Sequence, residues 1–587
     1  MRIAVVERKR CQPKKCSLEC IRFCPVNRTG GECILLSEEH GKAQISEELC
    51  TGCGICVKKC PFSAITIVGL PEELQEEMTH RYGENLFRLF RLPYPRKNSV
   101  LGLIGQNGTG KTTIVRILSG EIIPNLGDWE NGDESLVLKH FSGTQFYEYF
   151  EKLYAGDLRA VVKPQYVDQL PRVVKGTVRE ILEEVDEQGR LNEVLGELEL
   201  KEAENRDIKD ISGGELQRVA IAASLLREGD IYIFDEPSSY LDVRQRLKVA
   251  GIIRRLAQSK RVLVVEHDLI VLDYLADYIN IVYGVVGAYG IVSHPMTSRQ
   301  GINVYLGGYL KEENIRFRPQ EVKFEVRAPP DEWKGAPLLS FPDLRKTYKG
   351  FQLHVKGGNI NSGEVVGVLG PNAIGKTTFV KMLAGVVTPD TGKLDSKVRV
   401  SYKPQYIKPE NELTVAEAVA GARQGDPVFF DAEVSRPLEL KPLMDRSLGE
   451  LSGGELQRVA IAACLGRAAD IYLLDEPSAY LDVEQRLRVA KVIRRVMEKK
   501  GVTGIVVDHD LLFIDYISDR LMIFDGEPGV SGYATEPLGM KEGMNAFLKS
   551  VGITFRRDPV SGRPRANKPG SRKDKEQKAK GEYYYTS

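Results

Sequence analysis

The strongest constraint on the fold of this chain is an internal repeat that covers most of its length. The P-loop pattern G-x4-G-K-[ST] occurs at 105–112 and again at 370–377, each time after a short apolar run and before a helical pattern. Five further motifs follow each P-loop: K-P-Q-Y, S-G-G-E-L-Q-R, an apolar run ending in D-E-P, S-x-Y-L-D and V-V-[ED]-H-D. Because all six motifs recur in one order, we expect one folded module to occur twice.

The intervals between these motifs locate an insertion in the first copy. Gln165 and Ser212 lie 47 residues apart, and so do Gln405 and Ser452. In contrast, 54 residues separate Lys111 from Gln165, whereas the matching interval in the second copy is 29 residues. The first copy therefore carries about 25 additional residues, which we place within 127–157. We expect a helical hairpin on the surface; a solvated insertion without a partner is the alternative.

The P-loops predict the phosphate chemistry. Backbone N–H groups of such a loop surround phosphate oxygens at the positive end of the following helix. We expect Lys111 and Lys376 to reach the β- and γ-phosphates, and Thr112 and Thr377 to hold Mg²⁺. The other predicted nucleotide contacts of the loops are Gly105, Asn107, Gly108, Gly110 and Thr113 in the first copy, and Gly370, Asn372, Gly375 and Thr378 in the second.

Nine of the ten cysteines lie in the first 60 residues, and eight of them form two runs that each end in Cys-Pro. The second run is C-x2-C-x2-C-x3-C-P, which is typical of bacterial ferredoxins, and the first is a looser C-x4-C-x3-C-x3-C-P. In two-cluster ferredoxins the fourth cysteine of each run ligates the other cluster. We therefore expect two [4Fe–4S] clusters, one held by Cys11, Cys16, Cys20 and Cys60, the other by Cys24, Cys50, Cys53 and Cys56.

Three further points concern the identity of the metal and the roles of Cys33 and Cys464. Structural zinc is the alternative to iron and sulfide, although a C-x2-C-x2-C triplet divides poorly into zinc-type pairs. Cys33 is either a free buried thiol or a substitute ligand. Cys464 lies in an apolar helical stretch and is expected to pack in a core.

Composition excludes several classes of protein. The chain has 587 residues, 82 Lys and Arg against 81 Asp and Glu, and 42% hydrophobic residues. This balance excludes a uniformly basic nucleic-acid-binding protein and an acidic solvating chain. No apolar stretch approaches the ~20 residues that cross a bilayer, and the first residues lack a signal-peptide pattern. We expect a cytoplasmic protein without a membrane domain.

The repeated motifs resemble the Walker A, Q-loop, signature, Walker B, D-loop and H-loop of ABC ATPases, over roughly 81–525. The resemblance implies two parallel-stranded α/β modules, each with a helical subdomain that bears the signature. It also implies two composite sites, in which ATP lies between Walker A of one module and the signature of the other. The chain would then be a monomer whose modules pair within the molecule.

The family's roles carry over residue by residue. The first composite site would contain Lys111, Thr112, Gln165, Asp235, Glu236 and His267, facing Ser452, Gly453 and Gly454. The second would contain Lys376, Thr377, Gln405, Asp475, Glu476 and His509, facing Ser212, Gly213 and Gly214. The resemblance implies that the two Walker B aspartates complete the Mg²⁺ shell with the threonines and Q-loop glutamines. The glutamates would polarise the attacking water, and the histidines would contact the γ-phosphate.

The remaining family positions are less regular. Tyr82 and Tyr348 stand where the family stacks adenine on an aromatic ring, with Phe87 and Phe351 as alternatives. The signature has Glu215 and Glu455 where many transporters have glutamine, and Ile211 replaces the usual leading leucine. Ala373 replaces a P-loop glycine, which restricts the second loop. We expect two hydrolysis-competent sites with unequal rates.

The order of the domains is more specific than the ATPase motifs. A ferredoxin-like domain fused to twin modules, the first with an inserted hairpin, resembles the RNase L inhibitor family of ribosome-recycling ABC ATPases. The expected fold class is α/β, with two tandem ABC-type P-loop domains and a small α+β ferredoxin-like domain. We expect the cluster domain at 1–72, the first module at 73–300, hinge one at 301–335, the second module at 336–545, and hinge two with a basic tail at 546–587.

The resemblance also implies a function and its partners. Such a protein binds terminated or stalled ribosomes beside a release factor or its rescue paralogue. Closure of the modules on ATP then splits the subunits, and the protein stays on the small subunit, where it contacts ribosomal RNA and influences initiation through initiation factors. The main alternative is an ATP-gated iron–sulfur electron-transfer protein. A regulatory ATPase that docks on a membrane complex is a third possibility.

Two segments that follow the modules resemble each other and suggest hinges. Residues 307–319 and 547–559 both contain an aromatic-Leu-Lys sequence followed by Ile-x-Phe-Arg. Beyond the second, residues 556–587 carry ten Lys and Arg against four Asp and Glu, a local net charge of +6. Such a tail attracts RNA phosphate; a disordered solubilising tail is the alternative. Ser571 and Asp574 have the spacing of a helix cap.

Overall fold

The computed structural model describes residues 2–8, 10–47, 49–69, 74, 76–318, 321–322, 324, 337–394, 398–405, 407, 413–423 and 426–584. The expected boundary at 72–73, part of hinge one (319–320, 323 and 325–335) and the end of the tail (585–587) lie outside these residues. Contacts divide the chain into two compact units. The first is Met1–Ser239, Gly251–Glu266 and Leu275–Pro319, and the second is Tyr240–Ala250, His267–Tyr274 and Gln320–Ser587.

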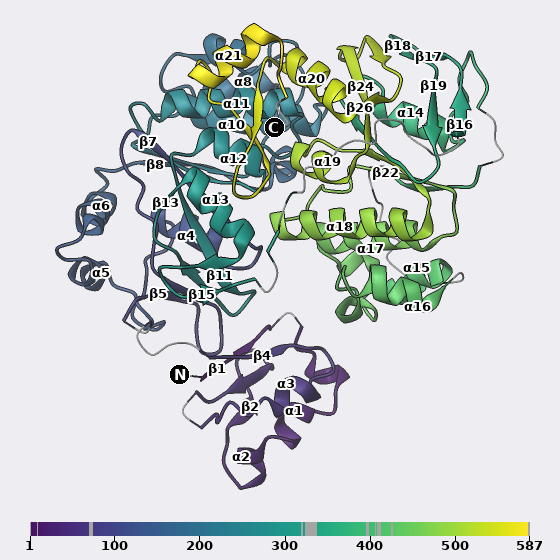
Figure 1. Cartoon of the computed structure of the whole chain (residues 1–587). Coiled ribbons are helices and arrows are strands. Elements are labelled where there is room, and N and C mark those ends of the chain that lie inside the picture. Colours follow the sequence, from purple (N-terminus) through teal and green to yellow (C-terminus); the bar gives the residue numbers. More distant parts are fainter. Residues whose placement is uncertain are drawn as a thin grey trace. The chain divides into compact units, whose positions relative to one another are not determined.

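The first unit begins with a small α+β segment that holds the cysteine runs, drawn in purple in Figure 1. Strand β1 (Arg2–Val6) pairs antiparallel with β4 (Ile65–Gly69), and β2 (Ile34–Leu36) pairs antiparallel with β3 (Ala43–Ile45). Its short helices are α1 (Glu19–Arg22), α2 (Pro25–Arg28) and α3 (Ile55–Lys59). Buried cysteines pack with Ala4, Ile45 and Ile65, so the metal-ligand candidates form much of this core.

The first ATPase module is built on a mixed sheet. Strands β8 (Ala160–Lys163), β9 (Ile231–Asp235) and β10 (Arg261–Val265) pair in parallel, as do β7 (Ser99–Gly105) and β11 (Tyr278–Val285). These strands are nearly continuous apolar runs because both faces of a parallel sheet are covered. The other strands are β5 (Met78–Arg81), β6 (Arg88–Phe90), β12 (Tyr289–Val292) and β13 (Met296–Thr297).

Helices of the first module carry the motifs between these strands. The principal ones are α4 (Lys111–Leu118), α7 (Leu170–Val173), α8 (Val178–Glu184), α9 (Leu191–Glu197) and α10 (Gly213–Leu226). Two more, α11 (Val243–Leu256) and α12 (Leu269–Leu275), contain residues of both contact units.

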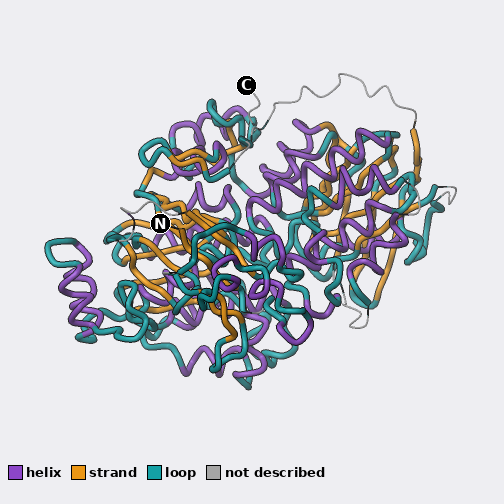
Figure 2. The backbone as a smooth tube through the Cα atoms, turned by 90° about the horizontal axis from the view of Figure 1, so that it is seen from below, coloured by secondary structure: helices purple, strands orange, loops and turns teal. Residues whose placement is uncertain are grey.

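The interval expected to contain an insertion folds as two helices, α5 (Glu134–His140) and α6 (Gln145–Tyr154), at the left edge of Figures 1 and 2. Asp133 and Thr144 accept hydrogen bonds from N–H groups in the first turns of these helices. Tyr149 and Phe150 are buried, and the Tyr149 hydroxyl donates to the carbonyl of Leu118 at 2.5 Å. The inner face of the hairpin is therefore fixed to the end of α4.

The second module repeats this architecture. Its parallel core consists of β20 (Val365–Leu369), β21 (Val400–Lys403), β22 (Ile471–Asp475), β23 (Thr503–Val507) and β24 (Arg520–Glu527). The accompanying strands are β16 (Pro337–Phe341), β17 (Leu344–Tyr348), β18 (Phe351–Val355), β19 (Gly358–Asn361), β25 (Ser531–Ala534) and β26 (Leu538–Gly539). Its main helices are α14 (Lys376–Leu383), α15 (Val415–Ala420), α16 (Pro427–Phe430), α17 (Gly453–Gly466), α18 (Val483–Lys500) and α19 (Leu511–Ile517).

Each module is followed by a helix and a small hairpin. In the first unit α13 (Ser298–Gly307) leads into β14 (Tyr309–Leu310) and β15 (Ile315–Arg316). In the second unit α20 (Met540–Val551) leads into β27 (Phe555–Arg557), β28 (Pro564–Ala566) and the final helix α21 (Arg572–Lys580). The repeat therefore extends into both segments expected to be hinges.

The basic tail is folded through residue 584. The hydroxyl of Ser571 accepts from the N–H of Asp574 and begins α21, as its spacing predicted. Arg557 makes two hydrogen bonds of 2.8 Å with the Asp515 carboxylate, and Thr554 donates to Asp574 at 2.8 Å. A disordered tail is therefore wrong for residues 556–584.

Across the described ranges, every helix is too short or too polar to cross a bilayer.

Candidate functional site

The first P-loop connects the buried strand β7 to α4. Lys111 is the first residue of α4, and its ammonium group donates to the carbonyls of Gly105 and Gln106 at 2.8 Å each. Gly108 and Gly110 have φ of +78° and +100°, values that side chains disfavour. The loop therefore wraps around the lysine, and its N–H groups lie at the start of a helix, where anions bind.

The second P-loop has the same form with one change. Lys376 begins α14 and donates to the carbonyl of Gly370 at 2.8 Å and also to that of Pro371. Ala373 stands where the first loop has Gly108 and has φ of +59°, so its methyl group is held in a left-handed conformation. Thr377 donates to a carboxylate oxygen of Asp475 at 2.9 Å. This pairing brings together two of the side chains expected to hold Mg²⁺.

The Walker B acids stand where β9 and β22 end. Gln165 donates to the Glu236 carboxylate at 2.6 Å, and Gln405 donates to the Glu476 carboxylate at 2.7 Å. Burial, together with Glu236, raises the pKa of Asp235 to about 7. Burial and the neighbouring charges of Asp475 and Asp508 raise the pKa of Glu476 to about 7. In both modules the Q-loop thus meets the glutamate that follows Walker B.

The histidine after β23 lies in the same cluster. The Nε2 atom of His509 is 3.6 Å from a carboxylate oxygen of Glu476. Burial, with Lys376 and Arg246, lowers the pKa of His509 well below its usual value, so the ring is neutral near pH 7. His267 follows β10 in sequence and is buried, and it belongs to the second contact unit.

The signature helices explain one departure from the family pattern. In α10 the hydroxyl of Ser212 accepts from the N–H of Glu215, whose carboxylate accepts from the N–H of Ser212 at 2.7 Å. Ser452 and Glu455 form the same capping box at the start of α17. A glutamate or a glutamine can form this box, but only the charged glutamate also forms the ion pairs seen here, Glu215 with Arg206 and Glu455 with Arg446, at 3.0 Å each. Gly213 and Gly214, and Gly453 and Gly454, form the first turns.

The aromatic candidates for adenine stacking divide in the same way in both modules. Tyr82 and Tyr348 are 41% and 43% exposed. Phe87 lies so close to Gly110 that a methyl group there would be 2.7 Å from its ring, and Phe351 is similarly close to Gly375. The phenylalanines therefore lie against the P-loop glycines, whereas the tyrosines are exposed rings.

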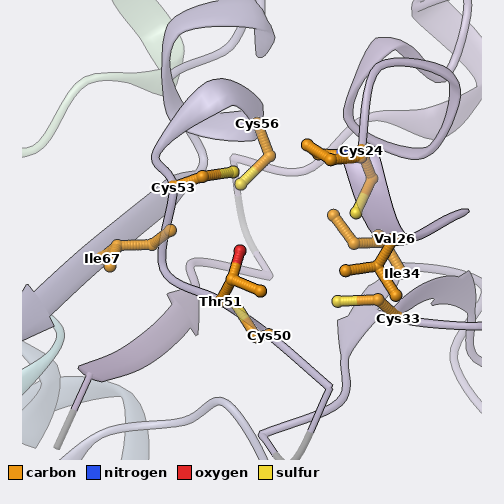
Figure 3. Close-up of a pocket in the computed structure, with 10 residues that line it drawn as sticks. Cys24, Val26, Cys33, Ile34, Cys50, Thr51, Cys53, Cys56 and Ile67 are labelled. Atoms are coloured by element: carbon orange, nitrogen blue, oxygen red, sulfur yellow. The ribbon is translucent and has the colours of Figure 1, made fainter. Parts of the chain in front are cut away.

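The second cysteine run lines a cavity with thiols from separate elements. Figure 3 shows Cys24, Cys50, Cys53 and Cys56 directed into a common space, and Cys33 lines the same cavity. A zinc ion needs ligands that converge on one point at about 2.3 Å. Within the described ranges, no three Cys, His, Asp or Glu side chains are arranged to hold a single ion. Cysteine thiolates are the ligands that hold iron–sulfur clusters, so the chemistry of this lining fits such a cluster.

The other predicted set also lies together. Burial raises the pKa of Cys20 to about 11, and the nearby thiols of Cys60, Cys11 and Cys16 contribute to the rise. Burial raises the pKa of Cys33, as do its neighbours Cys24 and Cys50. Cys33 is thus a buried thiol beside predicted ligands. Cys464 is 2% exposed within α17, which confirms its expected place in a core.

The structure also identifies polar residues beside the site that the sequence reasoning missed. Lys163 and Lys403 are buried at the ends of β8 and β21, and Gln217 and Gln457 are buried in the signature helices. All four contact the backbone next to the Walker B acids. The signal was present, because K-P-Q-Y and E-L-Q-R recur in both copies with these residues unchanged.

The cluster segment is anchored to the first module inside the first unit. Glu47 accepts hydrogen bonds from Arg81 at 2.5 Å and from Arg88, which is 1% exposed. Asn85 accepts from the N–H of Ile45 at 2.6 Å and donates to its carbonyl at 2.8 Å. These residues surround Tyr82 in sequence, so one turn carries both the anchor and an exposed ring of the nucleotide region.

Family models match the parts described above. The ABC transporter model matches residues 95–239 and 354–479, the model of a possible Fer4-like domain in RNase L inhibitor matches 1–32, and the 4Fe-4S binding domain model matches 43–66. Fold and sites together define an ABC-type ATPase with two nucleotide-binding modules and a ferredoxin-type 4Fe–4S domain.

Full-length relatives make the assignment specific. The chain is 46% identical to "Translation initiation factor RLI1" of Saccharomyces cerevisiae, covering 100% of this chain and 98% of the relative. It is 58% identical, with a TM-score of 0.93, to a chain of the "Model of ribosome-bound archaeal Pelota and ABCE1", covering 100% and 99% of the two chains. A chain of the crystal structure of archaeal ribosomal stalk protein aP1 with archaeal ribosome recycling factor aABCE1 is 57% identical, with a TM-score of 0.84, covering 88% and 100%. The chain belongs to the RNase L inhibitor family.

Proposed function

We propose that this chain is an ATP-driven ribosome-recycling factor. It binds terminated or stalled ribosomes beside a release factor or rescue paralogue, splits them into subunits and remains on the small subunit. The observation that carries the proposal is the match, with a TM-score of 0.93 over the whole chain, to a structure titled as ribosome-bound with Pelota. The similarity covers the cluster segment, both modules and the tail.

ATP hydrolysis supplies the energy. Lys111 and Lys376 bind the β- and γ-phosphates together with the P-loop N–H groups. Glu236 and Glu476 orient the attacking water. Gln165 and Gln405 contact these carboxylates and respond to whether nucleotide is bound in the site. Tyr82 and Tyr348 stack on adenine. His267 and His509 contact the γ-phosphate.

Magnesium and the clusters have separate tasks. The residues that would hold Mg²⁺ are Thr112, Gln165 and Asp235 in one site and Thr377, Gln405 and Asp475 in the other. When bound, the metal neutralises charge that develops on the phosphates. The eight cysteines of the two runs hold the clusters as rigid parts of the N-terminal domain, which Glu47 and Asn85 connect to the first module.

Movement follows from pairing of the modules. Ser212, Gly213 and Gly214 complete the site of the second module, and Ser452, Gly453 and Gly454 complete that of the first. Closure is a shift in population, because ATP binds better to the closed pair than to the open one. We place the working parts at 1–72, 73–300, 301–335, 336–545 and 546–587, so that closure moves the first of these against the ribosome.

The partners are the small subunit with its ribosomal RNA, a release or rescue factor, and initiation factors after splitting, and the compartment is the cytoplasm. The basic surface of α21 is suited to RNA phosphate. Electron transfer gated by ATP is not favoured, because the full-length relatives are named for translation and the ribosome.

The test is sedimentation of a lysate through a sucrose gradient. With a non-hydrolysable ATP analogue the chain should move with small ribosomal subunits, and a Glu236→Gln, Glu476→Gln variant should do so with ATP itself. Failure to find the chain with small subunits under both conditions would overturn the proposal.

A further inference from the structure

Each module contains a lysine where its sheet should be apolar. Lys163 ends β8 and is 0% exposed, and Lys403 ends β21 and is 1% exposed. An ammonium group in such a place is unfavourable unless it is hydrogen-bonded and near negative charge. Burial lowers the pKa of each lysine to about 8, although the Walker B carboxylates oppose the change. A buried lysine at the same position of both copies therefore serves some purpose besides filling space.

The contacts of these lysines point to the glutamate after Walker B. The ammonium of Lys163 donates to the carbonyl of Asp235 at 2.8 Å and lies 3.4 Å from that of Glu236. Lys403 donates to the carbonyl of Asp475 at 2.7 Å and lies 3.2 Å from that of Glu476. Each lysine thus contacts the two peptide units that flank the predicted catalytic glutamate.

These peptide units need external support. Glu236 and Glu476 have φ of +49° and +48°, a left-handed conformation that a side chain disfavours and that persists only when surrounding groups hold it. Their N–H groups donate to the carbonyls of Val265 and Val507 at 2.9 and 2.7 Å. The conformation sets the direction in which each carboxylate leaves the backbone.

A second donor reaches the same carbonyl from the signature helix. Gln217 donates to the carbonyl of Glu236 at 2.8 Å, and Gln457 donates to that of Glu476 at 2.6 Å. Both glutamines lie three residues after the signature glycines, in α10 and α17. The carbonyl of the glutamate is therefore where the Q-loop strand and the signature helix of one module meet.

We infer that Lys163 and Lys403, each with its signature glutamine, are positioning residues that hold the catalytic glutamate in its left-handed conformation. The lysine and the Q-loop glutamine are two residues apart, so one short segment contacts both parts of this glutamate. The lysine donates to the backbone on either side of it, and the glutamine donates to its carboxylate. The inference rests on the proposed catalytic role of Glu236 and Glu476. It adds that displacement of the Q-loop or of the signature helix turns the carboxylate.

The test is steady-state and single-turnover ATP hydrolysis by the full-length protein with its clusters. Lys163→Met with Lys403→Met keeps the shape of the side chain and removes the donor. We expect kcat to fall between about 10- and 100-fold, as for a misplaced catalytic group, while KM and the affinity for a fluorescent ATP analogue stay unchanged. Lys356→Met, which removes an exposed lysine paired with Glu536, is the matched control and should leave hydrolysis unchanged.

A second pair of variants guards against misfolding. Gln217→Met with Gln457→Met removes the other donor to the same carbonyl and should give the same loss of kcat at constant KM. Introduced into Glu236→Gln, Glu476→Gln protein, either pair should cause no further loss, because the glutamate it positions is already gone. If the protein with both lysine substitutions fails to fold, the protein with both glutamine substitutions tests the inference.

The outcomes separate this inference from the proposed function. Unchanged kcat in a folded lysine or glutamine pair, or a parallel loss of kcat and nucleotide affinity, would overturn the inference. If the Glu236→Gln, Glu476→Gln protein retained full turnover, the proposed catalytic role itself would fail.

Discussion

The first and second modules hold the glutamate after Walker B with the same contacts, yet they differ in their P-loops. Gln165 and Gln405, Lys163 and Lys403 make equivalent hydrogen bonds at nearly equal distances. In the P-loops, by contrast, a glycine with φ of +78° is replaced by an alanine with φ of +59°. The part of the site that directs hydrolysis is therefore duplicated closely, whereas the part that binds phosphate has diverged.

A second difference lies beside the histidines. Glu266 accepts from the N–H of Ser238 at 3.2 Å, while the shorter Asp508 accepts from both the N–H and the hydroxyl of Ser478, at 2.9 and 2.7 Å. Asp508 also contributes to the raised pKa of Glu476. The two modules therefore share the contacts of the glutamate but differ in the acidic side chain beside the histidine.

The largest expected effect tests the shared mechanism. Glu236→Gln and Glu476→Gln should each remove the turnover of one site, and together they should lower kcat at least about 100-fold, the usual contribution of general-base catalysis. Phosphate release by the two single variants and the double variant measures this. Glu228→Gln, in an exposed loop, is the control. If one single variant already abolished all turnover, the modules would not be equivalent catalytic units.

The next effect concerns pH at the second site. In Glu236→Gln protein, kcat should fall as the pH drops below about 7, because Glu476, with a pKa of about 7, becomes protonated and no longer polarises water. Asp508→Asn removes a negative charge that raises this pKa, so kcat at pH 6 should increase relative to pH 8, by at most about tenfold for one pKa unit. Profiles of kcat from pH 5.5 to 8.5 test this prediction. A profile that Asp508→Asn does not shift along the pH axis would contradict it.

Most of this comparison could be predicted from the sequence, because the repeat aligns the motifs residue by residue. The P-loops and cysteine runs follow from spacing, since each motif places its groups within a few residues, and the Walker B acids follow from the resemblance to ABC ATPases. The restriction at Ala373 was also foreseeable, because a P-loop glycine was missing there.

The support around the glutamates could not be predicted in the same way. Lys163 and Glu236 are 73 residues apart, and their contact depends on β8 pairing with β9, which local patterns do not specify. Glu215 departs from the signature, and its ion pair with Arg206 was not predicted from the sequence. Likewise, Asn85 reaches Ile45 across 40 residues. Sequence motifs identify the residues that contact substrate. They are less informative about the residues that hold those side chains in place.

A smaller effect tests the divergence of the P-loops. Gly108→Ala adds a methyl group at φ of +78° and within 2.9 Å of Val286, so it should destabilise the first module by roughly 1 kcal/mol. Ala373→Gly relieves the same strain in the second module and should change its stability by less, because glycine gains freedom in the unfolded chain. Thermal unfolding of each variant, with and without ATP, measures both effects. Destabilisation by Ala373→Gly as large as that by Gly108→Ala would show that Ala373 is not strained.

The smallest effect concerns the signature caps, which the modules share. Glu215→Ala should destabilise α10 by roughly 0.5 to 1 kcal/mol, because it removes the capping box and the ion pair with Arg206 at 3.0 Å. Glu215→Gln should cost less, since glutamine can also accept from the N–H of Ser212. Glu455→Ala and Glu455→Gln provide the same test in α17, where Arg446 takes the place of Arg206. Chemical denaturation measures all four variants. Equal losses for glutamine and alanine would mean that the charge of the glutamate, rather than its cap, explains why both copies depart from the transporter signature.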